Sequence, residues 1–127
     1  MYIEINDTTT LQNIQERFKA YYPWLSLDFF SSPHHRYESS DSRNLLNLGR
    51  TLSTIKKTHV SGIFEILPMN RALDLEREFE RRFGIGVQVL MKEHDQWKQT
   101  TGLDDLTLKE LNVLSRNASD EVLMESE

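Results

Sequence analysis

Hydrophobic and polar residues alternate in four short stretches of the chain, and this alternation predicts four β-strands. The stretches cover residues 2–6, 25–30, 60–67 and 87–91. A period of two places every second side chain on the same face of a sheet, so each strand is expected to bury one face. A fifth, short strand is expected around Trp97, after a turn at residues 93–96.

Other segments carry hydrophobic residues at steps of three and four, which predict helices. A first helix starts at a Thr9–Gln12 capping box and stops before Pro23. A second runs from about Met69 to Phe83, where Gly84 provides a left-handed stop. A short helix is expected within residues 51–57, and a last helix near Thr107, where Glu110 completes a second capping box.

The two halves of the chain echo each other at a spacing of 61 residues. The matched pairs are Glu4 and Glu65, Ile5 and Ile66, Ile14 and Leu75, Phe18 and Phe79, and Tyr22 and Phe83. The echo implies two β-α-β halves. We therefore predict an α+β fold in the order β-α-β-(short α)-β-α-β-β-α, ferredoxin-like in outline. Its two main helices lie on one face of a single sheet, and strands 2–6 and 60–67 lie side by side in the middle.

Length and composition set the domain organisation. A chain of 127 residues fits a single domain, here residues 1–117, followed by an acidic disordered tail at 118–127. The tail contributes four carboxylates to a formal net charge of −5. The sequence contains no cysteine and no apolar run of membrane-spanning length. These features favour a reducing cytoplasm and no membrane partner.

The predicted topology places Glu4 and Glu65 together on the outer face of the sheet, away from the helices. Neighbouring carboxylates are suited to acid–base chemistry or to a divalent cation. Two glutamates that merely decorate a solvated face are the favoured alternative, because no His or Asp is placed to complete a site.

Apolar residues are also expected on that outer face, and a monomer seldom leaves such a patch in water. Either the last helix covers it through Leu108, Leu111 and Leu114, or a second copy packs there as a homodimer. We favour the intramolecular cover. The patch consists of Tyr2, Phe30, Ile63, Leu67 and Leu90.

A basic segment between residues 43 and 59 could bind an anion or an acidic partner. Its cations are Arg43, Arg50, Lys56 and Lys57. Scattered loop cations are more often simply solvated. The outer-face glutamates and a pI near 5.4 disfavour nucleic acid as a partner.

No catalytic, cofactor or metal motif is recognised. Adjacent His34 and His35 point to opposite sides of an extended chain and rarely chelate one ion together. His94 and Asp95 fall in a predicted turn, and no phosphate-binding glycine loop or nucleophile motif occurs. The sequence predicts neither a catalytic residue nor a cofactor.

The segment from Trp97 to Asn112 resembles one found in small uncharacterised bacterial proteins of similar length. The shared features are Trp97, Thr100, Thr101, Asp104, Asp105, Thr107, Leu108 and Asn112, preceded by a Phe83–Gly84 helix end. The resemblance implies a standalone domain of a bacterial cytoplasm and carries no activity with it.

These observations favour a non-enzymatic protein-binding or adaptor domain with a protein partner. A small-ligand binder or enzyme using Glu4 and Glu65 is the alternative. Weak nucleic-acid binding through the basic 43–59 loop is the third hypothesis.

Overall fold

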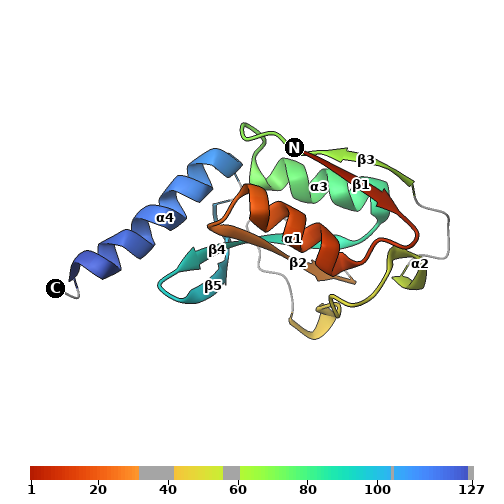
Figure 1. The fold of residues 1–127 in the computed structure, drawn as a ribbon, viewed down its shortest axis with the longest axis horizontal. Helices are drawn as coiled ribbons and strands as arrows, with labels where there is room; N and C mark the ends of the chain where they lie inside the picture. Colours follow the sequence, from red (N-terminus) through yellow and green to blue (C-terminus); the bar gives the residue numbers. More distant parts are fainter. Residues whose placement is uncertain (32–41, 56–60, 104, 126–127) are drawn as a thin grey trace.

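The computed structural model describes residues 1–31, 42–55, 61–103 and 105–125. Its elements follow the predicted order, with one additional 3₁₀ turn, and the fold is α+β (Figure 1). In chain order they are β1 (Tyr2–Asn6), α1 (Leu11–Tyr21), β2 (Leu25–Phe30), η1 (Ser42–Asn44), α2 (Leu52–Ile55), β3 (Ser61–Glu65), α3 (Ala72–Phe83), β4 (Gly86–Glu93), β5 (Gln96–Gln99) and α4 (Leu108–Glu125).

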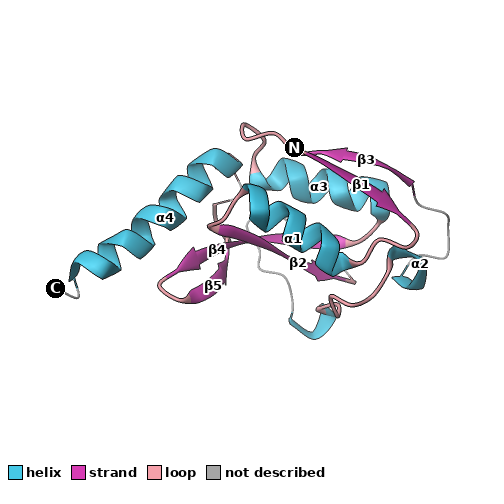
Figure 2. Cartoon of the chain, in the orientation of Figure 1, coloured by secondary structure: helices cyan, strands magenta, loops and turns pink. Residues whose placement is uncertain are grey.

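The strands form two antiparallel sheets, where a single sheet was predicted (Figure 2). β1 pairs with β3, as expected, with Ile3 opposite Phe64. β2 pairs instead with β4, with Leu27 opposite Val89, and β5 extends that sheet beyond β4. The predicted adjacency of the first and third strands is therefore confirmed, but they do not lie in the middle of a continuous sheet.

Hydrogen bonds along the strand edges explain this separation. On α1, Arg17 Nη2 donates to the Tyr2 carbonyl at 2.9 Å, and on α3, Arg82 Nη1 donates to the Ile63 carbonyl at 2.9 Å. The outer edge of β2 is occupied in the same way, since its Leu27 carbonyl accepts from Gln15 Nε2 at 2.9 Å. Edge groups that are already bonded offer less to a further strand, so the two sheets stay apart.

One hydrophobic core joins both sheets to the helices. The apolar residues of the 61-residue echo lie in this core: Phe18 and Phe79 are almost fully buried, and their neighbours Ile14 and Leu75 are buried as well. The ring of Phe64 on β3 contacts that of Phe79 on α3 at 5.7 Å between centroids. The predicted inner faces of the two main helices are confirmed.

Local sequence sets the helix ends. Thr10 caps α1, since its hydroxyl accepts from the Asn13 N–H at 3.1 Å. The predicted cap, Thr9, lies one residue earlier and accepts from the Asn6 N–H instead. Gly84 ends α3 in the left-handed conformation, with a φ of 65°. Only glycine adopts this region without steric cost, so the end of α3 at Gly84 could be predicted from the sequence.

The last helix differs from the prediction at its far end. α4 continues through residues 118–125, where a disordered tail was expected. This segment contains no Gly or Pro, and glutamate, leucine and methionine are good helix formers, so nothing local stops the helix at residue 117. No helix in the described part of the chain is long and apolar enough to span a membrane.

Candidate functional site

The most exposed apolar residues of the strands gather on the side of β1 and β3 that faces away from α1 and α3. We call this the β1–β3 outer face, consisting of Tyr2, Glu4, Ile63, Glu65 and Leu67. Antiparallel register places Tyr2 opposite Glu65 and Glu4 opposite Ile63. The alternation predicted for these strands is confirmed, because Ile3, Ile5, Phe64 and Ile66 on the opposite side are buried.

Exposure on this face is high for its apolar side chains. Tyr2 is 63% exposed and Ile63 is 60% exposed, while Leu67 is partly exposed at the end of β3. Tyr2 stands diagonally between Ile63 and Leu67, so the three form one patch. Exposed apolar side chains that lie together make this face a candidate surface for contact with another molecule.

Glu4 and Glu65 share this face, as the sequence predicted, and both are exposed. Register makes them diagonal neighbours, a relation that separates Cβ atoms by about 7 Å. Hydrogen bonding to Glu65 and repulsion from its charge raise the pKa of the Tyr2 hydroxyl. Nowhere in the described residues do three or more His, Cys, Asp or Glu side chains gather to hold a metal ion.

The predicted apolar patch is divided between the two sheets. Phe30 and Leu90 lie on the β2–β4–β5 sheet and are only 2% and 6% exposed. α4 packs against β4 and β2, where Leu108 and Leu111 enter the core and Leu114 remains exposed. The prediction that the last helix covers the whole patch was therefore wrong, because α4 packs against the β2–β4–β5 sheet.

The basic segment is only partly described. Lys56 and Lys57 lie outside the described residues, as do His34 and His35. Arg43 is exposed, and Arg50 Nη2 donates to the Thr54 carbonyl at 2.7 Å. The Arg50 guanidinium is thus bonded to the backbone of its own segment.

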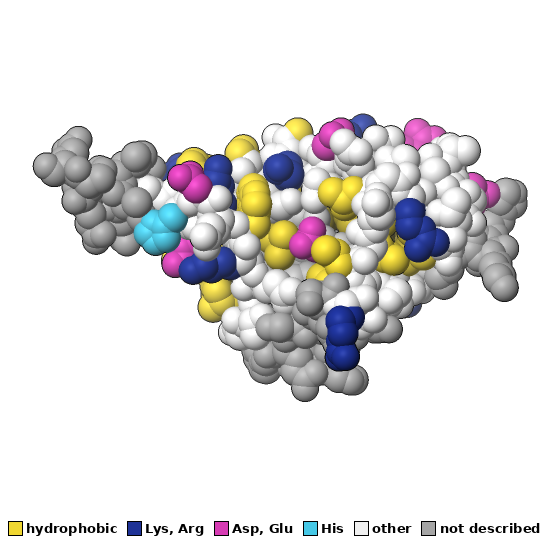
Figure 3. All heavy atoms as spheres, turned by 90° about the horizontal axis from the view of Figure 1, so that it is seen from below, with side chains coloured by type: hydrophobic (Ala, Val, Ile, Leu, Met, Phe, Trp, Pro, Cys, Tyr) yellow, Lys and Arg dark blue, Asp and Glu magenta, His cyan; other side chains and the backbone are white. Residues whose placement is uncertain are grey.

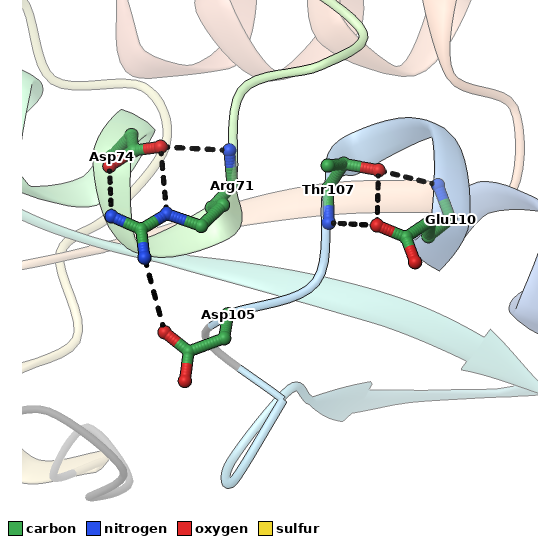
Figure 4. A network of polar contacts seen from close by, with 5 residues as sticks. All are labelled: Arg71, Asp74, Asp105, Thr107 and Glu110. Atoms are coloured by element: carbon green, nitrogen blue, oxygen red, sulfur yellow. Dashed lines mark hydrogen bonds and ion pairs between the residues drawn. The ribbon is translucent and has the colours of Figure 1, made fainter.

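Sequence reasoning missed a polar network at the start of α3 and α4 (Figure 4). Arg71 donates from its backbone and guanidinium to Asp74, and its Nη1 reaches Asp105 at 3.4 Å. The Arg71 hydrogen bonds lower the pKa of Asp74. Next to it, Thr107 and Glu110 form the predicted capping box. This network joins two helix starts and is structural.

A buried carboxylate was also missed. Glu76 on α3 accepts from the Val89 N–H at 3.0 Å and from Gln88 Nε2 at 3.3 Å. Its place between Leu75 and Phe79 on the inner side of the helix could have indicated burial. The glutamate thus satisfies a backbone donor of β4 beyond the end of β5.

Comparison with known proteins adds no information about function. No family model, curated protein or solved structure matches the chain. The β1–β3 outer face is therefore interpreted from its own geometry.

Proposed function

We propose that this chain is a non-enzymatic protein-binding domain whose β1–β3 outer face binds a partner segment carrying both apolar and basic residues. The observation that supports this most directly is the exposure of Tyr2 and Ile63 beside two exposed glutamates. Covering an isoleucine side chain completely is worth about 1.5–3 kcal/mol. A partner that covers this face gains such burial.

The charge of the face determines the kind of partner. Its charged residues are Glu4 and Glu65, and no Lys or Arg occupies an outward position of β1 or β3 between residues 2–6 and 61–65. A two-fold homodimer through this face would bring four carboxylates together, which disfavours self-association. A partner with lysine or arginine beside its apolar residues would be complementary.

Binding through the face is favoured over addition of a strand to the sheet. The Tyr2 and Ile63 edge carbonyls are already bonded to Arg17 and Arg82, and the Asn6 N–H donates to Thr9 Oγ1 at 2.9 Å. Strand addition needs free backbone groups along an edge. A partner that contacts the outward side chains leaves these edge hydrogen bonds in place.

The absence of cysteine fits a reducing compartment such as a bacterial cytoplasm. We propose that the domain works there as an adaptor.

A photo-crosslinking amino acid placed at position 63 of the full chain, in its native cells, tests the proposal. The same residue at position 21 is the control, because Tyr21 is also an exposed apolar residue but lies on α1. We expect a discrete protein adduct from position 63 only, and its loss in the Glu4→Lys/Glu65→Lys variant. Equal adducts from both positions, or an adduct that survives charge reversal, would contradict the proposal.

A further inference from the structure

A second surface, on the β2–β4–β5 sheet, combines tryptophan and lysine. The Lys92 N–H donates to the Trp24 carbonyl at 3.1 Å, and Lys92 is the cross-strand partner of Trp97. Because Leu25 and Met91 point into the core, these neighbouring positions project from the outer side of the sheet. Trp24, Lys92 and Trp97 therefore form a row across the sheet, which we call the indole–lysine row.

Two ammonium groups lie close to this row. Lys92 Nζ is 6.0 Å from the Trp24 ring centroid and 5.9 Å from that of Trp97. Lys19, from the last turn of α1, brings its Nζ to 5.1 Å from the Trp97 centroid. Figure 3 shows this side of the molecule, with Lys and Arg side chains beside hydrophobic ones near the β4–β5 hairpin.

These two cations lack an acidic partner within the described part of the chain. No carboxylate there is within ion-pair distance of Lys19 or Lys92. Lys98, the residue after Trp97, differs, because its Nζ lies 3.3 Å from a Glu93 carboxylate oxygen. Two cations around one indole, with no counter-ion among the residues that the structure describes, are suited to an anionic ligand.

Hydrogen bonds from α4 fix the backbone beneath the row. Asn112 Oδ1 accepts from the Trp24 N–H at 3.1 Å, and Ser115 Oγ donates to the Trp24 carbonyl at 2.9 Å. The same hydroxyl contacts the Lys92 carbonyl. The row thus lies on a rigid sheet, while Trp97 remains 38% exposed.

We propose that the indole–lysine row binds a nucleotide unit, meaning a planar base attached to a phosphate. The base stacks on the indole of Trp97, and the phosphate is held by the ammonium groups of Lys19 and Lys92. A lysine over an exposed aromatic ring is held weakly, and a stacked base is held more strongly, so the ligand can displace the lysines toward its phosphate.

Other features of the sheet set the limits of the site. Asp28 lies on the same side of β2, four residues beyond Trp24, and repels phosphate from the far end of the sheet. The phosphate is therefore placed at the hairpin end, near Lys92. A free nucleotide and a single-stranded nucleic acid both supply this chemistry, and this surface is separate from the β1–β3 outer face.

NMR of the full chain tests the proposal directly, because its two tryptophans both belong to the row. Titration with AMP is expected to shift the Trp97 indole N–H signal saturably, whereas adenosine and inorganic phosphate bind at least about tenfold more weakly. The Lys19→Ala/Lys92→Ala variant is expected to lose about tenfold in affinity or more for AMP, whereas Lys98→Ala matches the wild type. Melting curves confirm that each variant is folded.

A second titration, with oligothymidylate, distinguishes a free nucleotide from a single-stranded nucleic acid as the source of the nucleotide unit. Tighter binding of the oligonucleotide, with a dependence on salt that weakens in the double variant, assigns the site to single strands. Binding of AMP alone assigns it to free nucleotides. Absence of an indole shift with both probes, or equal losses in Lys98→Ala and the double variant, would overturn the proposal.

Discussion

The outer faces of the two sheets carry similar sequence patterns and have different environments. On β1 and β3, the outward residues Tyr2 and Ile63 are more than half exposed. On β2 and β4, the outward residues Phe30 and Leu90 are buried, as are Ser26 and Gln88 between them. Alternation therefore tells which side of a strand a residue occupies, but only tertiary packing decides whether that side meets water.

The acidic residues of the two faces differ in the same way. Glu4 and Glu65 are exposed, whereas Asp28 is half-buried, and burial raises the pKa of its carboxyl group. The outward positions around Phe30 and Leu90 thus belong to the packed interior, whereas Tyr2 and Ile63 on the β1–β3 outer face are available for contact. Substitutions at these two sets of outward positions should consequently separate stability from binding at the β1–β3 outer face.

The largest difference is expected between Leu90→Ala and Ile63→Ala. Both remove a large aliphatic side chain from an outward strand position, but Leu90 is buried and Ile63 is exposed. Leu90→Ala should lower the free energy of unfolding by about 2–5 kcal/mol. Ile63→Ala should change it by less than about 0.5 kcal/mol. Urea unfolding measures both, and similar losses would show that the two faces are equally packed.

A smaller loss in the free energy of unfolding is expected for Glu76→Ala, which removes the carboxylate acceptor at the edge of β4. The Val89 N–H would lose its partner in a buried place, and hydrogen bonds to charged groups contribute about 1.5–3 kcal/mol. Glu80→Ala is the matched control, because Glu80 is exposed on the same helix. The free energy of unfolding of the control should stay within about 0.5 kcal/mol of the wild type. If Glu76→Ala and Glu80→Ala were equally stable, the hydrogen bond between the Val89 N–H and Glu76 would not stabilise the edge of β4.

Most of the fold could be predicted from local sequence. The order of elements, the inward positions of Phe18 and Phe79, and the stop at Gly84 follow from periodicity and capping. The division into two sheets could not, because it depends on contacts distant in sequence. Arg17 reaches Tyr2 across 15 residues and Gln15 reaches Leu27 across 12. Neither contact leaves a periodic pattern in the chain.

The candidate surfaces were predictable to different degrees. Glu4 and Glu65 were correctly placed on one face, because strand register preserves the alternation of each strand. The indole–lysine row was not foreseen, because it combines the end of α1, the start of β2 and a hairpin. Only the pairing of β2 with β4 brings Trp24 beside Lys92, and that pairing was not predicted.

The smallest expected effect concerns the pH dependence of stability, tested with Asp28→Asn. The folded-state pKa of Asp28 is raised by burial. Proton binding to Asp28 therefore favours the folded state, and this contribution is lost as the pH rises through the raised pKa. Asp28→Asn should be more stable than the wild type at neutral pH, and this advantage should shrink below about pH 4, the ordinary carboxyl range.

Asp74→Asn provides a control of opposite sign. Hydrogen bonds from Arg71 lower the folded-state pKa of Asp74, so its contribution is present above the ordinary carboxyl pKa and is lost as the pH falls through the lowered value. The Asp74→Asn variant should therefore be less stable than the wild type at neutral pH and approach it in acid. Urea midpoints measured across this range give both curves. Desolvation and ion pairing act on the pKa of a carboxyl group with opposite signs. If both variants shifted stability in the same direction at neutral pH, the contrast between the half-buried Asp28 and the ion-paired Asp74 would therefore fail.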